Sequence, residues 1–588
     1  MLPRVWAPSA AAVDLVLGDE RVPMERADAW WETDRDLPPG TDYAFSLDGG
    51  PPRPDPRSAW QPAGVHGPSR VFDTAQLGWS DEAWPGVDVR GAVLYELHVG
   101  TFTSGGTLDS AAAELPSLVD LGVDVVELMP IAPFDGDRGW GYDGVGLYAV
   151  HDAYGGPAAL QRFVDTAHGL GLGVCLDVVY NHLGPAGAYV SEFGPYLTDA
   201  HETPWGAAIN LDQPGSDEVR RWVIESALRW LSDFHVDALR LDAVHALADD
   251  RPVHLLTQLA NRVAALSSTV GRPLSLVAET DLNDVVSVTP TAEGGWGMTA
   301  QWADDVHHAI HALLTGERHG YYVDFGTPAA LRAALTGVFV HDGTWSTFRD
   351  QEWGRPVPPD TDGHRFVVSV QTHDQVGNRA IGDRPGHQHP DLVLAASAAL
   401  MILSPFTPML FMGEEWGTRT PFQFFTSYTD PSLAAAVREG RTREFGGHGW
   451  AELYGGDVEV PDPQARSTFE ASILDRTELA EPAHARMLAW YRTLIALRRA
   501  VPDFASGDLT ATDLTWGGGS ADGPWDGWLV LRRGAARVVI NLSAEPVLVD
   551  AGHDDVVAAW FEAGDEPATG IRAAVAPPRS ITVLLRLP

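Results

Sequence analysis

The feature that most constrains the fold is a series of apolar, strand-like runs that alternate with helical stretches from Gly91 onward. This alternation is typical of βαβ units, which build a parallel sheet covered by helices. Eight such strands, with the helices between them, close into a barrel. We therefore predict an α/β fold with a (β/α)8 TIM barrel, whose strands are residues 93–98, 123–129, 173–179, 236–241, 274–278, a weaker 298–302, 366–371 and 408–412.

The segments that flank the barrel have a different pattern. Residues 1–88 alternate short β-like runs with Gly/Pro turn clusters, which predicts an N-terminal β-sandwich. A helical spacing over residues 485–499 indicates the last barrel helix, and residues 503–588 turn β-like again, as in a C-terminal antiparallel β domain. The barrel then spans 89–502. Its Gly/Pro/Tyr-rich insertion at about 183–214 exceeds ordinary loop lengths, so we expect it to be functional.

Charge and composition narrow the classes of partner. The 588 residues include 80 acidic and 40 basic ones, for a net charge of −40. Such a surface repels nucleic acid and anionic membranes and suits a neutral substrate. No apolar run approaches the ~20 residues of a membrane span, and the N-terminus lacks a secretory signal pattern, so we expect a cytoplasmic protein. The single cysteine, Cys175, excludes an intramolecular disulfide.

Four short polar segments close apolar runs of the predicted barrel. They are residues 177–182 (DVVYNH), 239–242 (LRLD), 277–280 (VAET) and 371–374 (QTHD). A barrel enzyme gathers its chemistry at these strand ends. A single Asp in such a place is usually a cap or a solvated loop residue, but the order and content of all four segments resemble the retaining α-amylase family of glycoside hydrolases.

The resemblance implies three carboxyl groups with separate roles. Asp242 corresponds to the nucleophile, Glu279 to the acid/base and Asp374 to the group that stabilises the transition state. Arg240 precedes Asp242 by two residues, so strand periodicity points both side chains the same way and the guanidinium keeps the nucleophile ionised. The neighbouring carboxylates should in turn hold the proton on Glu279.

The resemblance also implies contacts to the substrate. His182 and His373 match histidines that hydrogen-bond the sugar at the cleavage subsite, and Tyr142 matches an aromatic residue that stacks on it. Asp177, with Asn181, is expected to brace the site or to touch the substrate indirectly. Amylases often hold calcium near the corresponding Asn, but the insertion here lacks an Asp-dense cluster. We therefore expect no metal and no cofactor.

Further segments favour one branch of the family. Residues 240–246, 278–284, 302–308, 314–318, 371–378 and 411–416 resemble the trehalohydrolases, which cut the α-1,4 bond beside the terminal trehalose of maltooligosyltrehalose. The resemblance implies this α-glucan as substrate and functional coupling to a maltooligosyltrehalose synthase. Candidates for trehalose recognition are Asp305 and Trp416, with Asp304 and Glu415 beside them. Alternatively, Asp304 and Asp305 are the N-cap and first-turn acid of a helix that begins near Val306.

Two rival functions remain open at this point. A 1,4-α-glucan branching enzyme would transfer the covalent intermediate to a sugar hydroxyl instead of water, and we would expect Glu where this chain has Gln375. A non-catalytic amylase-like binding protein would be expected to lose one of the three carboxyl groups. Because the chain keeps all three, the residues favour a hydrolase.

Overall fold

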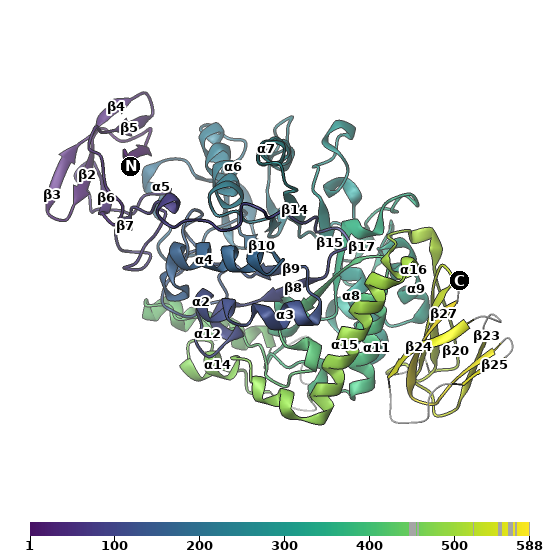
Figure 1. Cartoon of the computed structure of the whole chain (residues 1–588). Coiled ribbons are helices and arrows are strands. Elements are labelled where there is room, and N and C mark those ends of the chain that lie inside the picture. The colour runs from purple at the N-terminus through teal and green to yellow at the C-terminus, as the bar shows by residue number, and fades with distance from the viewer. Residues whose placement is uncertain are drawn as a thin grey trace.

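Eight parallel strands form a closed barrel in the computed structural model, which describes residues 1–445, 454, 458–520, 523–550, 555–561, 568–570 and 573–586 (Figure 1). Each strand lies at or within one residue of a predicted run, so the predicted (β/α)8 barrel is confirmed. In barrel order the strands are β8 (Leu94–Leu97), β9 (Val125–Leu128), β10 (Gly173–Val178), β13 (Ala238–Leu241), β14 (Ser275–Ala278), β15 (Ala300–Trp302), β18 (Phe366–Ser369) and β19 (Thr407–Phe411).

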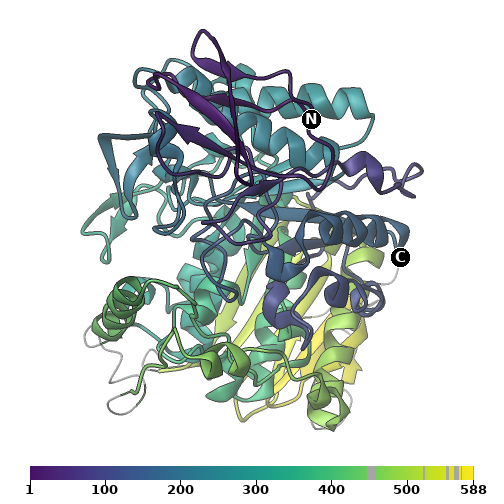
Figure 2. The ribbon, with the colours of Figure 1, turned by 90° about the vertical axis from the view of Figure 1, so that its left-hand side faces the viewer.

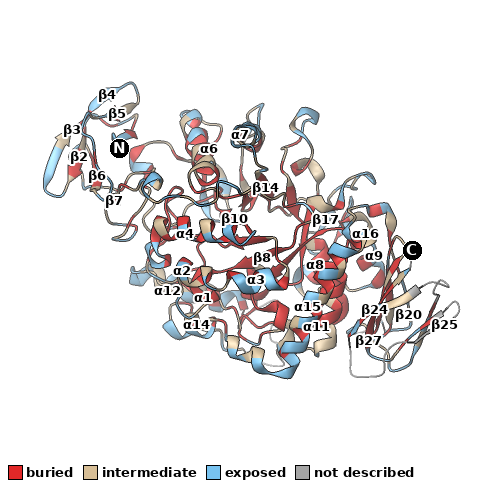
Figure 3. Ribbon diagram, in the orientation of Figure 1, coloured by how far each residue is buried: buried red, intermediate tan, exposed pale blue. Residues whose placement is uncertain are grey.

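Every residue of these eight strands is buried (Figure 3). Strands covered on both faces must be almost wholly apolar, which explains their continuous Val/Leu/Ala runs. The polar exceptions are Glu96, Glu127, Asp177, Arg240 and Gln301, each at most 2% exposed. Buried polar groups are costly unless they are paired, so these residues mark the part of the barrel that serves chemistry.

Helices cover the barrel, among them α4 (Gly156–Gly169), α6 (Ser216–Asp233), α7 (Leu255–Val270), α8 (Asp304–Thr315), α11 (Asp391–Ile402) and α15 (Pro482–Ala500). The last of these contains the predicted helix 485–499. It begins at Pro482 and carries Arg498 and Arg499 in its last turn, as helix termini favour. The buried Arg498 guanidinium donates to the carbonyls of Ile402 and Ser404, both at 2.9 Å, and so ties α15 to the end of α11.

Additional β structure flanks the barrel, as predicted. Before it lie a three-stranded sheet (β1-β5-β4) and a four-stranded sheet (β3-β2-β6-β7), all within Arg4–Arg70. After it lie a five-stranded sheet (β20-β21-β22-β27-β24) and a three-stranded sheet (β23-β26-β25), between Thr512 and Arg586. The two β regions lie at opposite ends of the barrel, and Figure 2 views the molecule from the N-terminal one. Parts of the predicted domain 503–588 lie outside the described residues.

Two β-hairpins arise from loops that follow barrel strands. The insertion after β10 contains α5 (Val190–Phe193) and the hairpin β11 (Leu197–Thr203) to β12 (Gly206–Ile209). A second hairpin, β16 (Thr344–Ser346) to β17 (Gln351–Trp353), follows α9 (Pro328–Gly337) and was not predicted. Among the described residues, no helix is long and apolar enough to cross a membrane. The cytoplasmic location stays a prediction.

Candidate active site

The three predicted carboxyl groups come from loops that follow barrel strands. Asp242 directly follows β13 and Glu279 directly follows β14, and these strands pair in parallel with Leu241 opposite Ala278. Asp374 lies in the first turn of α10 (His373–Gly377), which follows β18. The sequence prediction that Asp242 and Glu279 occupy neighbouring strand ends is therefore confirmed by the register.

One buried guanidinium connects the strand ends. Arg240 is 0% exposed and its Nη1 donates to Asp177 Oδ2 and to Asp242 Oδ1, both at 2.8 Å. Its Nη2 lies 3.8 Å from Glu279 Oε2. Burial lowers the pKa of Arg240, but the surrounding carboxylates outweigh it and hold that pKa well above its usual range. Because Asn181 Nδ2 donates to the other oxygen of Asp242 at 2.8 Å, both Asp242 oxygens are fixed.

Glu279 has the opposite electrostatic environment. Burial is the largest cause that raises the pKa of Glu279; the negative charges of Asp242 and Asp374 add to it and Arg240 opposes it. The sequence indicated the neighbouring charges but not the burial. Ala243 also contributes: its positive φ of 39°, uncommon for a residue with a Cβ, aims its N–H at Glu279 Oε2 at 2.6 Å. The site thus combines an ionised Asp242 with a carboxyl group that favours its proton.

Tyr142 and His373 form one wall of the site. The Tyr142 hydroxyl donates to Asp177 Oδ2 at 2.6 Å, and its ring stacks on the imidazole of His373 with a centroid distance of 4.9 Å. Gly141 allows this arrangement, because it has φ of +96° and an added Cβ would lie 2.2 Å from the carbonyl oxygen of Pro130. The structure therefore brings Tyr142, Asp177, Arg240 and His373 together, as the resemblance implied.

A first cavity, of about 910 Å³ with its open mouth, lies on the Asp374 side of the carboxyl groups. Its lining includes Asp304, Tyr321, Phe348, Trp353 and Asp374. Phe348 is 56% exposed, in the connection of the β16–β17 hairpin. The sequence offered no signal for Phe348 or Trp353, and it marked Tyr321 only as part of a family-like segment.

A second cavity, of about 840 Å³, lies on the side of Tyr142 and His182. His182 Nε2 bonds the Tyr142 carbonyl at 2.8 Å, and Trp205 at the tip of the β11–β12 hairpin stacks on the His182 ring at 4.7 Å. Trp205 is 48% exposed, so one face remains open to a ligand. Sequence reasoning marked the insertion as functional but did not single out this residue.

The acids of α8 divide between the cavity and the frame. Asp304 and Asp305 both line the first cavity and both lie in the first turn of α8, after the N-cap Ala303. Burial, with the charges of Glu279 and Asp374, raises the pKa of Asp304 to about 7. Asp305 Oδ2 instead accepts from the N–H of Val340 at 2.7 Å and from two further donors. Its bonds thus hold the loop that precedes the β16–β17 hairpin.

The structure does not bring Trp416 to the cleft. Its side chain is 1% exposed in η9 (Glu414–Trp416), and its Nε1 donates to Glu478 Oε2 at 3.1 Å. Glu415 is also buried and accepts from the Tyr95 hydroxyl at 3.0 Å. Neither residue lines the described cavities, so the expected contact with the substrate is corrected for both. A family-like segment could not reveal that its side chains face the core.

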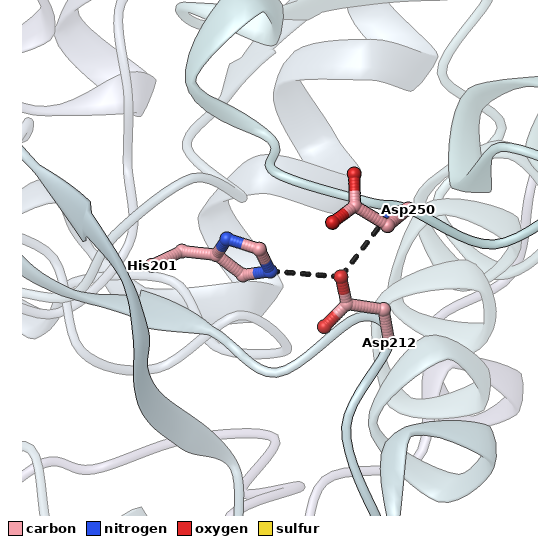
Figure 4. A group of neighbouring side chains, drawn as sticks. All are labelled: His201, Asp212 and Asp250. Carbon is pink, nitrogen blue, oxygen red and sulfur yellow. Dashed lines mark hydrogen bonds and ion pairs between the residues drawn. The ribbon is translucent and has the colours of Figure 1, made fainter.

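One group of side chains among the described residues has the spacing of metal ligands. His201, Asp212 and Asp250 each place a ligand atom within 4.8 Å of the others (Figure 4). Asp212 Oδ2 already accepts from His201 Nε2 at 2.8 Å and from the Asp250 N–H at 3.1 Å, and Asp250 is exposed. Protein donors satisfy this oxygen, so the geometry does not call for an ion. The absence of a metal stays a prediction.

Comparisons with known proteins define first the class. A model of the "Alpha amylase, catalytic domain" matches residues 68–202. A crystal structure of a Salmonella typhimurium protein described as a candidate alpha amylase superposes with a TM-score of 0.87 at 36% identity, covering 100% of this chain and 97% of that one. An apo pullulanase from Paenibacillus barengoltzii shares the fold alone, with a TM-score of 0.68 at 19% identity and 100% and 93% coverage. The protein is therefore a barrel enzyme of the α-amylase class.

Curated relatives specify the family within that class. The chain is 51% identical to the malto-oligosyltrehalose trehalohydrolase of Arthrobacter ramosus, over 95% of each sequence. It is 48% identical to that of Mycobacterium tuberculosis strain H37Rv, again over 95% of each. A Vibrio cholerae 1,4-alpha-glucan branching enzyme matches only 41% of the chain and 37% of its own length, at 34% identity. The chain belongs to the malto-oligosyltrehalose trehalohydrolase family.

The raised pKa of Glu279 predicts a pH-dependent stability. Above the ordinary glutamate pKa of about 4.3, the folded state retains a proton that the unfolded chain has lost, so stability falls as pH rises toward the folded pKa. Glu279→Gln removes this dependence. We expect the variant to melt at a higher temperature than the wild type at pH 8 and to lose this advantage at pH 4. Glu293→Gln, at an exposed position, is the matched control. An equal difference at both pH values would contradict the shift.

Proposed function

We propose that this protein hydrolyses the α-1,4-glucosidic bond next to the terminal trehalose of maltooligosyltrehalose and releases trehalose and a maltooligosaccharide. One observation carries the proposal. The full set of Asp242, Glu279, Asp374 and Arg240 is assembled in a chain that aligns with trehalohydrolases over 95% of its length. A branching enzyme is disfavoured, because its match covers less than half of the chain.

The geometry supports a retaining, two-step reaction. Asp242, held ionised by Arg240, attacks the anomeric carbon while Glu279 gives its proton to the departing glycosidic oxygen. This forms a glycosyl ester on Asp242 and frees the trehalose. Glu279, now a carboxylate, removes a proton from water, which attacks the same carbon and restores Asp242. Asp374 is proposed to grip the hydroxyls of the distorted sugar and to balance oxocarbenium charge.

The two cavities suggest how the substrate lies. The glucan chain would run over Tyr142, His182 and Trp205, whose rings offer apolar faces to sugars. The trehalose unit would occupy the first cavity, against Asp304, Tyr321 and Phe348. In this arrangement Asp305 acts through the loop that it holds, and Trp416 has no contact with substrate.

The substrate implies a position in metabolism. Maltooligosyltrehalose must be made by an enzyme that converts a reducing-end maltose unit into trehalose, so we propose functional coupling to a maltooligosyltrehalose synthase. The overall role would be trehalose production from α-glucan. We also propose division of the chain into an N-terminal β-sandwich (1–88), the barrel (89–502) and a C-terminal β domain (503–588), on the distribution of the sheets.

Removal of the nucleophile or the acid should abolish turnover without unfolding the protein. We expect Asp242→Asn and Glu279→Gln each to lower kcat by at least about 1000-fold, because the covalent route has no substitute for either group. Glu293→Gln, exposed, should keep wild-type turnover. Steady-state kinetics and thermal melting are measured on the same samples. Near-normal turnover by either folded variant would contradict the assignment.

Selectivity should depend on the first cavity. Buried polar groups that fit the α,α-1,1-linked pair are left imperfectly paired by a flexible reducing-end maltose. We therefore expect kcat/KM for maltooligosyltrehalose to exceed that for a maltooligosaccharide of equal length by at least about 100-fold. Asp304→Ala, Tyr321→Ala and Phe348→Ala should narrow this ratio.

The buried Trp416 provides a control for that experiment. Trp416→Phe keeps most of the packing and loses only the bond to Glu478, so it should leave the ratio unchanged. Chromatography of the products identifies trehalose. Equal activity of the wild type on both substrates would indicate a general α-amylase, and new α-1,6 branch points in amylose would indicate a branching enzyme.

A further inference from the structure

Two glutamates lie side by side inside the barrel, beneath the proposed catalytic groups. Glu96 on β8 and Glu127 on β9 are partners in the parallel register. They are 1% and 0% exposed. Two buried carboxylates so close together cannot both remain charged at a small cost, so the surroundings must distinguish them.

Glu96 makes a two-point contact with His373. Its Oε1 lies 2.5 Å from His373 Nδ1, and its Oε2 accepts the backbone N–H of His373 at 3.0 Å. The ring is further confined by stacking on Tyr142 at 4.9 Å and by contact with Trp140 at 5.9 Å. Since Nδ1 must donate to the carboxylate, the ring is fixed in orientation. Its other nitrogen, Nε2, lies 3.6 Å from Asp374 Oδ2.

Glu127 has no such partner. Neither of its carboxyl oxygens has a hydrogen-bond partner in the part of the chain that the structure describes. Burial, followed by the charges of Glu96 and Asp177, raises the pKa of Glu127 to about 8. Glu127 is therefore a neutral acid at pH 7, and the negative charge of the pair resides on Glu96.

Several charged groups face His373. Glu96 lies on β8 and Asp374 on α10, while Arg240 on β13, Asp177 on β10 and His98 after β8 lie around the ring. Burial lowers the pKa of His373, but Glu96 and Asp374 outweigh it and raise that pKa to about 9. At neutral pH His373 is then a cation that lies between two carboxylates.

We propose that Glu96 is a positioning residue that holds His373 with both ring nitrogens protonated, so that Nε2–H is always a donor to Asp374 and to the sugar hydroxyl bound there. The contact with the sugar rests on the proposed function. A neutral His373 that donates from Nδ1 would present a bare Nε2 to the carboxylate of Asp374, which is repulsive. Glu96 thus fixes the polarity of the contact as well as its geometry.

The matched variants are Glu96→Gln and Glu127→Gln. Each changes one buried glutamate to its neutral isostere, but only the first removes a charge, because Glu127 is already neutral. The probe is NMR of 13C-labelled histidine, with His373 identified by the signal missing from His373→Asn. We expect His373 to titrate near pH 9 in the wild type and in Glu127→Gln. In Glu96→Gln it should titrate at or below the ordinary value of about 6.5.

Activity gives an independent measurement. The ratio of kcat/KM for Glu96→Gln to that of the wild type cancels the titration of Glu279. It should rise at least about 10-fold from pH 8 to pH 5.5, as His373 regains its proton. Glu127→Gln should show a constant ratio, and Glu96→Asp, which keeps the charge, should recover most of the loss at pH 8.

Specific outcomes would overturn the proposal. A wild-type His373 that titrates at or below about 6.5 does so even if Glu96→Gln fails to fold. A Glu96→Gln ratio that is equally low at every pH would show that Glu96 only supports the packing. The NMR titration needs no substrate, so a protein inactive on maltooligosyltrehalose whose His373 titrates near 9 would refute the proposed function and leave the charge on His373 intact.

Discussion

The active site depends on a single buried cation. Arg240 has no exposed surface, and its guanidinium bonds Asp177 and Asp242 while it lies within 4 Å of Glu279. Such a charge is tolerated only where carboxylates surround it, and breaking a buried pair leaves an uncompensated ion. The same contact keeps the proposed nucleophile ionised and in place. Fold stability and chemistry therefore depend on the same interaction.

The barrel is what makes this arrangement possible. Parallel strands present their carboxyl ends at one edge, so short segments far apart in the chain meet there. Loops after these strands then determine what the site accepts. The insertion hairpin contributes Trp205 on one side and the loop of the β16–β17 hairpin contributes Phe348 on the other. The family of trehalohydrolases to which the chain belongs is distinguished, in our account, by the second side.

The sequence predicted the barrel strands and the carboxyl groups well, because both leave local signals. Continuous apolar runs mark strands buried on both faces, and the residues that close those runs fall at strand ends by geometry. Side-chain direction in a loop leaves no such signal. Trp416 and Asp305 were expected to bind substrate, but Trp416 faces the core and Asp305 bonds a loop. Phe348 and the pairing of Asp250 with His201 and Asp212 depend on contacts between distant segments, which no local pattern reveals.

The central claim is that Asp242 attacks the sugar and retains the anomeric configuration, with Glu279 on the adjacent strand as acid and base. Proton NMR during the first turnovers on maltooligosyltrehalose tests it most directly, because the anomeric proton of the new reducing end reports the configuration before mutarotation. The account predicts that the α-anomer of the maltooligosaccharide appears first and that the β-anomer grows in later. Initial appearance of the β-anomer would show direct attack by water and would contradict the covalent route through Asp242.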